Sequence, residues 1–327
     1  MTTQAPAGTT APAAAGAGLH RWLPLAAVAF TLVSWASAFV AIRHLGGTVP
    51  PGALSLGRLV VAVAVLAVLV RAQDRFRGRF RVPGRRKWPL VVLGGVSWIT
   101  VYNLALNEAE RRIDAGTAAL LVQLGPILVA LLAVVVFRDR LTPWLVVGLA
   151  VGFGGVVLIG RATSEGGDGD LVGVLLGVVA AVGFAVGVVT QKKLLGGGMT
   201  ALDMTFWYYV VGMVGCLPWS GQLVDAVGRA SAADLWWITY LGVVPSAIAF
   251  TTWAYALSRA DAGKFAMTTF LVPFLTALMA WLLLSEVPPP LAFVGGVLCI
   301  GGVLLSRRAG PLRPARRTPS PPPPASP

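Results

Sequence analysis

Charged residues, cysteine and histidine are all scarce in this chain of 327 residues. Charged residues make up 12% of it, about half the share usual in soluble globular proteins, while 56% of the residues are hydrophobic. Both cysteines, Cys216 and Cys299, lie inside apolar segments, and the two histidines, His20 and His44, flank the first such segment. So few thiols and imidazoles exclude a disulfide framework, and we predict no metal site.

Sequence signatures of nucleotide binding are also missing. No glycine-rich loop leads into the Lys-Ser or Lys-Thr pair with which an ATPase holds phosphates. The run Gly152-Phe-Gly-Gly155 lies within an apolar segment without a preceding strand, so it does not fit a dinucleotide site. Neither half of the chain gathers candidate catalytic residues. We therefore expect a protein that is not an enzyme and uses no cofactor.

Long apolar segments dominate the chain. Ten of them, each of about 17–25 residues, are long enough to cross the roughly 30 Å of hydrocarbon in a bilayer. They are too long and too uniformly apolar for barrel strands, which predicts an all-α integral membrane protein with ten transmembrane helices. The segments are Trp22–Ile42, Gly52–Val70, Trp88–Leu106, Ala115–Phe137, Thr142–Gly160, Leu171–Thr190, Ala201–Trp219, Leu235–Leu257, Ala262–Leu284 and Pro290–Ser306.

Basic residues lie mainly between these segments. The net charge of +13 could suggest nucleic acid, but no basic face is organised against phosphates, and we predict no nucleic-acid partner. Twenty of the 26 Lys and Arg residues fall in the two tails and in the second, fourth, sixth and eighth connections. Because cytoplasmic loops carry such an excess, we predict a multi-pass protein of the cytoplasmic membrane with both termini cytoplasmic.

Each end of the chain reads as a disordered cytoplasmic tail. Residues 1–20 are rich in Ala, Gly, Pro and Thr and carry no charged residue. Residues 309–327 are rich in Pro and Arg, which fits a solvated basic tail beside anionic lipid. The Ser-Pro-Pro-Pro-Pro run in this tail also fits an SH3-like groove as the alternative.

The chain repeats itself with a shift of 147 residues. Residues 112–161 align with residues 259–308 without a gap, and nineteen of the fifty positions are identical. Shared apolar composition alone would not keep charged residues, prolines and glycines in register. Equivalent pairs include Asp114 with Asp261, Pro126 with Pro273, Asp139 with Glu286, Gly148 with Gly295, and Gly155 with Gly302.

The matched pieces are the fourth and fifth apolar segments and the ninth and tenth, so the repeat is five helices long. An odd number of crossings makes the second copy enter the membrane from the other side. The prediction is therefore two inverted-topology repeats with a substrate site between them near the midplane. We place the first repeat at residues 21–161, a loop at 162–170 and the second repeat at 171–308.

The motifs of these repeats carry a resemblance to a known family. The second copy reads Leu271-Val-Pro-Phe-Leu-Thr-Ala-Leu-Met-Ala-Trp-Leu-Leu-Leu-Ser-Glu286, and the first has Leu124-Gly-Pro-Ile-Leu-Val-Ala-Leu-Leu-Ala at the matching place. The first apolar segment contains Ser34-Trp-Ala-Ser-Ala-Phe-Val-Ala41. Over roughly residues 22–308 the chain resembles the EamA-type ten-helix branch of the drug/metabolite transporter superfamily. That family usually has Glu where the first copy has Asp139.

The resemblance implies carriers of amino acids, other metabolites or drugs. Together with the inverted repeat, it predicts a secondary transporter that exports small metabolites or drugs by alternating access. The alternative is a membrane-embedded protein that binds solute, or acts as a scaffold, without transport. The expected partners are a small-molecule substrate and the lipid bilayer.

Polar and aromatic side chains at membrane depth are the candidate substrate ligands. The same residue types also form interfacial belts and join helices to one another, so each candidate has a structural alternative. The candidates are Trp35, Tyr102, Asn103, Gln123, Tyr208, Trp253, Tyr255, Thr268 and Thr269.

Pro126 and Pro273 are expected in mid-helix, as hinges or as static kinks. Asp139 and Glu286 are expected at helix ends, where each either pairs with a cation or caps the next helix, or takes a coupling proton.

Arg58 lies near the outer end of the second segment. It is expected either to face the protein interior or to extend to the membrane interface. Asp203, in the other half of the chain, is its candidate partner.

Overall fold

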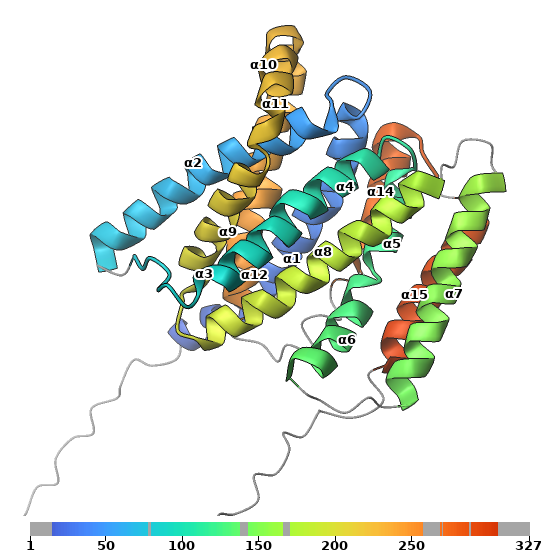
Figure 1. Cartoon of the computed structure of the whole chain (residues 1–327), viewed down its shortest axis with the longest axis horizontal. Coiled ribbons are helices and arrows are strands. Elements are labelled where there is room, and N and C mark those ends of the chain that lie inside the picture. Colours follow the sequence, from blue (N-terminus) through green and yellow to red (C-terminus); the bar gives the residue numbers. More distant parts are fainter. Residues whose placement is uncertain are drawn as a thin grey trace, which may run out of the picture.

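The computed structural model describes residues 15–77, 80–137, 143–165, 171–257, 269, 271–287 and 289–306. All regular secondary structure in these residues is helical, as Figure 1 shows. The α-helices are α1 (Ala15–Leu45), α2 (Pro51–Arg77), α3 (Trp88–Gly94), α4 (Tyr102–Ala109), α5 (Ala115–Val122), α6 (Gly125–Phe137), α7 (Pro143–Glu165), α8 (Leu171–Gly196), α9 (Ala201–Gly215), α10 (Ser220–Arg229), α11 (Ala232–Leu241), α12 (Ala249–Leu257), α14 (Leu271–Leu284) and α15 (Pro290–Ser306).

Several of these helices are long and apolar enough to cross a membrane. Five spans in the described residues meet that test unbroken, namely Leu25–Leu45, Pro51–Arg75, Trp88–Ala109, Leu171–Leu195 and Ala232–Ala256. A sixth consists of α9 with the segment after it, bent by 50°. Shorter apolar helices occupy Ala115–Val129, Val146–Ile159, Leu271–Leu284 and Pro290–Gly302. The protein is therefore an all-helical membrane protein, and the prediction of ten crossings goes beyond its unbroken spans.

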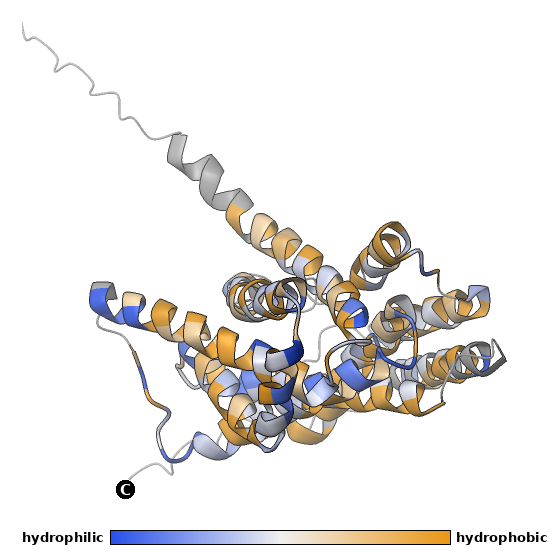
Figure 2. Ribbon diagram, turned by 90° about the horizontal axis from the view of Figure 1, so that it is seen from above, coloured by the Kyte–Doolittle hydropathy of each residue, from blue (hydrophilic) through white to orange (hydrophobic). Residues whose placement is uncertain are grey.

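Apolar side chains cover the outer faces of the helices as well as the core. Hydrophobic residues predominate along most helices in Figure 2. Val135 is 71% exposed, and Val68 and Leu283 are exposed to a similar degree. So many exposed aliphatic side chains would be costly in water and are favourable against lipid.

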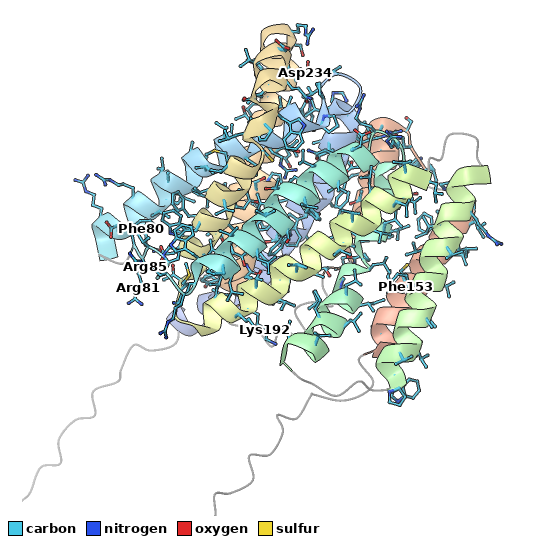
Figure 3. The ribbon with its side chains drawn as sticks, viewed as in Figure 1. Phe80, Arg81, Arg85, Phe153, Lys192 and Asp234 are labelled. Atoms are coloured by element: carbon cyan, nitrogen blue, oxygen red, sulfur yellow. The ribbon has the colours of Figure 1, made fainter. Side chains whose placement is uncertain are left out.

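The second and sixth connections lie at one end of the bundle. Figure 3 labels Arg81, Arg85 and Lys192 near one end of the helices and Asp234 near the opposite end. At the first end, the Nζ atom of Lys87 donates to the carbonyl oxygen of Gly197 at 2.6 Å. Two connections that were expected on the same side of the membrane are thus in direct contact.

Two of the expected helices are interrupted, contrary to the sequence interpretation. The segment Ala115–Phe137 breaks between α5 and α6, directly before Pro126, because proline has no N–H and cannot continue the hydrogen bonding of α5. The segment Ala201–Trp219 leaves α-helix at Gly215 and continues as a 3₁₀ turn that contains Pro218. The same loss of a backbone donor explains this second break.

Two further helices each contain a π-helical turn, at Gly95–Val101 between α3 and α4 and at Gly242–Ile248 between α11 and α12. In the second turn, Pro245 supplies no N–H for the carbonyl of Leu241 four residues earlier, and the Ser246 hydroxyl donates to that carbonyl instead, at 2.7 Å. The two turns begin 147 residues apart, in the register of the sequence repeat.

Helices α7 and α15 pack side by side at one edge of the molecule (Figure 1). Their contact depends on glycine. A Cβ atom added at Gly155 would collide with the carbonyl oxygen of Gly295, and one added at Gly302 would collide with that of Gly148. The pairs are related by the 147-residue shift, so each helix contributes the equivalent surface. Backbones approach this closely only where side chains are missing.

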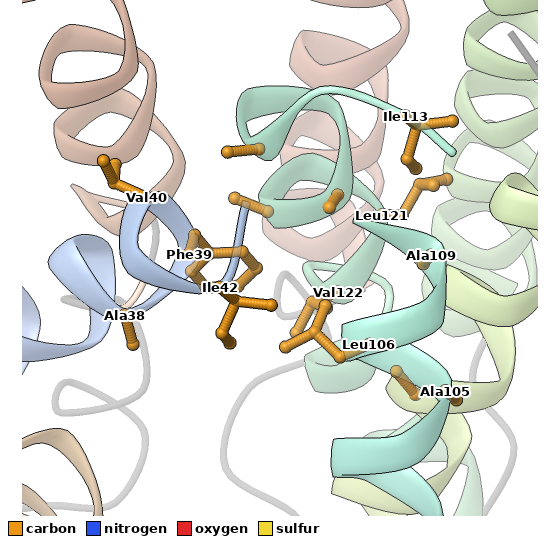
Figure 4. Packing of buried hydrophobic residues seen from close by; sticks show 14 of the residues in the cluster. Ala38, Phe39, Val40, Ile42, Ala105, Leu106, Ala109, Ile113, Leu121 and Val122 are labelled. Carbon is orange, nitrogen blue, oxygen red and sulfur yellow. The ribbon is translucent and has the colours of Figure 1, made fainter. Parts of the chain in front are cut away.

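The core joins helices from both parts of the chain, and one region of it lies between α1, α4 and α5. In Figure 4, Phe39 and Ile42 of α1 face Leu106 of α4 and Val122 of α5, and all four are buried. All four side chains also line the cavity described next.

Candidate functional site

A cavity of about 690 Å³, including its open mouth, lies between helices from both halves of the chain. The space within it that the centre of a water molecule can occupy is about 70 Å³. Its lining residues are Trp35, Ala38, Phe39, Ile42, Arg58, Trp98, Tyr102, Leu106, Ala119, Val122, Gln123, Phe184, Pro245, Phe250, Thr269 and Val272. Both π-helical turns contribute, through Trp98 and Pro245, which are themselves 147 residues apart. Such turns recur at functional sites because they re-aim the side chains that follow them.

Aromatic rings form one wall of the cavity. The ring of Trp98 lies 5.0 Å from that of Phe250 and 5.3 Å from that of Phe184, and Trp35 lies 5.4 Å from Phe250. Gly187 of α8 faces this wall, and a Cβ atom there would overlap the Trp98 indole. The wall is thus a packed surface that suits an apolar group of a solute.

Arg58 is the charged residue among the side chains that line the cavity. It is 6% exposed, and its Nε and Nη2 atoms donate to Ser246 Oγ at 3.3 and 3.0 Å. Within the described part of the chain, no carboxylate lies in ion-pair distance of its guanidinium. The interior-facing alternative for Arg58 is therefore confirmed. A buried cation without an anion is costly, so this arrangement is suited to receive one.

The expected pairing of Arg58 with Asp203 is wrong. Asp203 lies in the first turn of α9, and its electrostatic neighbours include Asp74 and Arg81. Asp74 is sixteen residues beyond Arg58 on α2, which places it about 24 Å away along the helix axis. Sequence spacing could not reveal this because it does not tell which ends of α2 and α9 meet.

Gln123 and Thr269 join the two halves of the chain at the cavity. The Nε2 atom of Gln123 donates to the carbonyl oxygen of Thr269 at 2.8 Å, and both residues line the cavity. Gln123 stands at the break between α5 and α6, where the backbone is not α-helical. Of the candidate ligands, Trp35, Tyr102, Gln123 and Thr269 are brought together here.

Asn103 and Tyr208 lie outside the cavity lining. The Nδ2 atom of Asn103 donates to the carbonyl oxygen of Ile99 one turn earlier, at 2.6 Å. The Tyr208 hydroxyl donates to Thr190 Oγ1 at 2.8 Å and joins α9 to α8. Both side chains are buried; Tyr208 joins two helices, as its structural alternative predicts, whereas Asn103 bonds within its own helical segment.

The remaining candidates are more distant from the cavity or cannot be placed. Trp253 packs on Trp35 with ring centroids 4.8 Å apart and so lies behind the aromatic wall. Tyr255 is half-buried and does not line the cavity. Thr268 lies outside the described residues.

Pro126 and Pro273 are not in mid-helix, contrary to expectation. Pro126 is the second residue of α6, and Pro273 is the third residue of α14. In the first turn of a helix a missing N–H costs no hydrogen bond, so these prolines start helices and do not bend them. Asp139, the acidic residue of the first copy, lies outside the described residues.

Glu286 pairs with a cation, as one of its two interpretations predicts. Its Oε1 atom accepts a hydrogen bond from Arg43 Nε at 2.8 Å, which connects α1 to the segment after α14. Arg43 Nη1 also donates to the carbonyl oxygen of Glu110 at 2.7 Å. Nearby, Arg111 Nε donates to the carbonyl oxygen of Gly46 at 2.9 Å. These bonds hold the ends of α1, α4 and α14 together.

The sequence interpretation missed Glu110. This residue directly follows α4, and its side chain is fully buried. In the sequence it stands among Glu108, Arg111 and Arg112, a cluster that reads as a solvated connection. Only the packing of three other segments over it distinguishes it from its neighbours.

Comparison with known proteins gives consistent matches over most of the chain. The EamA-like transporter family matches residues 22–161 and again residues 171–308. A protein of Streptantibioticus cattleyicolor named "probable terminal-alkyne amino-acid exporter" is 36% identical over 283 residues, 86% of this chain and 92% of that protein. An uncharacterized transporter of Bacillus subtilis is 30% identical over 278 residues, 82% of this chain and 86% of its own.

More distant similarities agree with these. A protein of Escherichia coli named "probable amino-acid metabolite efflux pump" is 24% identical over 294 residues, 84% of this chain and 91% of its own. One solved crystal structure covers 90% of this chain and 99% of its own chain with a TM-score of 0.57 and 19% identity, which is a likeness of fold.

Proposed function

The chain belongs to the EamA-like transporter family, as its repeat motifs predict, and we propose that it is a secondary carrier that exports small amphipathic carboxylates across the cell membrane. The observation that carries this proposal is Arg58, a buried cation in a cavity otherwise lined mainly by apolar and aromatic residues. A solute that brings both a carboxylate and an apolar group satisfies both parts of the cavity.

The guanidinium supports the carboxylate half of this proposal. It presents planar donors that match a carboxylate, and charge-assisted hydrogen bonds of this kind are stronger than neutral ones. Ser246 holds two of the nitrogen atoms of Arg58, and the bond from Ser246 to the Leu241 carbonyl fixes the hydroxyl in turn. The cation is therefore oriented before a solute arrives, which lowers the entropic cost of binding.

The names of two relatives support the same solute class. One is named as an exporter of terminal-alkyne amino acids and another as an efflux pump for amino-acid metabolites. Amino acids with apolar side chains are small amphipathic carboxylates. Export, rather than import, is the direction that both names give.

Alternating access between two inverted five-helix repeats, residues 21–161 and 171–308, is the mechanism that we propose for these ten helices. Three relations support it: the 147-residue sequence register, the π-helical turns that follow that register, and the equivalent glycine surfaces of α7 and α15. Both termini are cytoplasmic in this proposal, because the basic connections share one end of the bundle.

The helix starts at Pro126 and Pro273 are the proposed hinge points. Pro273 adjoins Val272 and Pro126 lies three residues after Gln123, both of which line the cavity, and the Gln123–Thr269 hydrogen bond connects the two halves. The Arg43–Glu286 ion pair closes the exterior end of the cavity region in this proposal. Breaking this ion pair while the cytoplasmic end of the cavity closes would expose the solute to the exterior.

Flux into proteoliposomes tests the proposal. Tritiated L-phenylalanine serves as probe, with unlabelled L-propargylglycine, L-phenylalaninamide and phenethylamine as competitors. We expect saturable flux that propargylglycine inhibits and that the amide and the amine, which lack the carboxylate, do not. Flux that does not saturate, or equal inhibition by all three compounds, would contradict a carboxylate carrier.

The alternative, a protein that binds solute or acts as a scaffold without transport, predicts different outcomes. It would bind phenylalanine in detergent but show no flux in liposomes. Deletion of residues 309–327 distinguishes a carrier from a scaffold. A carrier keeps its flux without this tail, whereas a scaffold that acts through the tail loses its partner.

A further inference from the structure

Glu110 is a buried carboxyl group that the transport scheme above leaves unused. Its side chain is fully buried, and neither of its carboxylate oxygens has a hydrogen-bond partner among the described residues. Glu108, two residues earlier, is partly exposed and pairs with Arg112 at 2.8 Å and with Arg111 at 3.6 Å. Of these two neighbouring glutamates, Glu108 is partly exposed and paired, whereas Glu110 is buried and unpaired. Ionisation of Glu110 therefore carries the larger desolvation cost.

Five ionisable side chains from the surrounding segments face Glu110. Arg43 of α1 and Arg58 of α2 attract a negative charge on it, and Glu286 and Asp114 repel one. The fifth, Tyr102 of α4, interacts electrostatically with both Arg58 and Glu110.

Most of these groups are committed to other bonds. Arg43 pairs with Glu286, and the Asp114 carboxylate accepts from Thr117 at the start of α5. Arg58 is the cation of this group that has no carboxylate in ion-pair distance within the described chain. Arg43 is the stronger attraction on Glu110 and Arg58 the next, and of the two Arg58 is the one that a solute anion can occupy without displacing a paired carboxylate of the described chain.

The protonation of Glu110 depends on the charges around it. Burial raises the pKa of the Glu110 carboxyl, and the positive charges of Arg43 and Arg58 oppose that rise. Removing the effect of either cation shifts the balance further toward the protonated form, since desolvation then acts without compensation.

We propose that Glu110 is the proton-binding residue of this carrier, and that its carboxylate competes with the carboxylate of the solute for the positive charge of Arg58. This inference rests on the proposed function. When a solute carboxylate docks on Arg58, the Glu110 carboxylate loses its electrostatic support and takes up one proton from water. When the solute leaves, Glu110 returns that proton to water and its charge again faces Arg58.

One proton and one amino-acid zwitterion then cross together, so one positive charge is transported with each solute. Both the electrical potential and a pH gradient act on such a cycle, and export down the concentration gradient of the solute carries a proton out with it. Replacing Glu110 with Gln imitates the protonated form at nearly the same volume. The Glu110→Gln variant should therefore keep solute exchange and lose its coupling to protons.

Infrared spectroscopy of the full-length protein in nanodiscs tests proton binding without any solute. We expect a C=O band of a protonated carboxyl that titrates with pH in the wild type, persists in Glu108→Gln and is absent from Glu110→Gln. A band that persists in Glu110→Gln, or a Glu110 that stays ionised over the whole pH range of the folded protein, would overturn the proposal.

Transport in proteoliposomes tests the coupling, with tritiated L-phenylalanine as probe. Exchange at equal concentrations should stay within about twofold of wild type in Glu110→Gln, because a neutral side chain leaves Arg58 free. Accumulation driven by a pH gradient should be lost in Glu110→Gln and kept in Glu108→Gln. Gradient-driven accumulation that survives in Glu110→Gln refutes the coupling role.

Failure of exchange in the wild type is a different result, since it counts against the proposed function. The infrared titration still decides in that case whether Glu110 binds a proton.

Discussion

The Sγ atom of Cys299 donates to the carbonyl oxygen of Gly152 at 3.4 Å, and these two residues occupy equivalent positions, 147 residues apart, in the two copies of the repeat. The contact joins the middle of α7 to the middle of α15. On either side of it, Gly155 meets Gly295 and Gly148 meets Gly302. A helix pair that contacts itself through equivalent residues has the arrangement expected around a two-fold axis.

The first prediction concerns Gly155. An alanine there places its Cβ against the carbonyl oxygen of Gly295, which is backbone and cannot turn aside. We expect Gly155→Ala to destabilise the protein by roughly 1–3 kcal/mol, the usual cost of overpacking. Gly154→Ala is the matched control, because a Cβ atom at Gly154 meets nothing within 4 Å. Thermal unfolding in detergent measures both, and equal midpoints would show that the two helices separate freely.

The second prediction concerns Arg58. Its replacement by Gln keeps a donor for Ser246 but removes the charge. Loss of a charge-assisted hydrogen bond of about 1.5–3 kcal/mol should weaken binding of a carboxylate solute by roughly 10- to 100-fold. Arg229→Gln, which changes an exposed arginine at the end of α10, should leave binding unchanged. Competition by propargylglycine measures the affinity, and an unchanged affinity in Arg58→Gln would remove this residue from the site.

The third prediction compares the two partners of an ion pair. Glu286→Gln removes the charge of one bond to Arg43, whereas Arg43→Gln removes that bond and also the bond to the Glu110 carbonyl. We expect Glu286→Gln to lower stability by about 0.5–1 kcal/mol and Arg43→Gln by about 1 kcal/mol more. Chemical denaturation of the purified variants gives both values. The opposite order would show that the Glu110 contact contributes nothing.

The fourth prediction concerns the aromatic wall. A methyl group at Gly187 overlaps the Cβ atom and the indole of Trp98, so this residue must shift and the cavity that it lines must change shape. We expect Gly187→Ala to reduce the flux of phenylalanine more than that of the smaller propargylglycine. Gly221→Ala, at an open position of α10, is the control. Equal loss for both solutes would indicate a folding defect in place of a change in the cavity.

The sequence predicted the features that depend on composition and register. Apolar length predicted a helical membrane protein and the motifs predicted the family, while the sequence left two locations open for Arg58, of which the structure has the interior one. Four of the nine candidate ligands line the cavity, because polar groups at membrane depth collect in cavities as well as between helices. Trp35, Tyr102, Gln123 and Thr269 belong to that group.

Features that depend on which helix ends lie next to each other could not be predicted from the sequence. The positions of Pro126 and Pro273 were expected in mid-helix because hydropathy continues across a helix break without interruption. The guessed Arg58–Asp203 pair required knowledge of which ends of α2 and α9 adjoin. Glu110 looked solvated because burial of a loop residue is decided by other segments, here those that carry Arg43 and Glu286.

The two π-helical turns have a consequence for how such a cavity diversifies. A π turn holds one residue more than the α-helical turn it replaces, and one residue corresponds to about 100° of rotation around a helix axis. Loss of a single codon within Gly95–Val101 or Gly242–Ile248 would therefore return that turn to α-helix and replace Trp98 or Pro245 at the cavity by another residue of the turn, while the flanking helices stay in place. The two walls can be re-aimed independently in this way, which offers a short evolutionary route from one cargo to another.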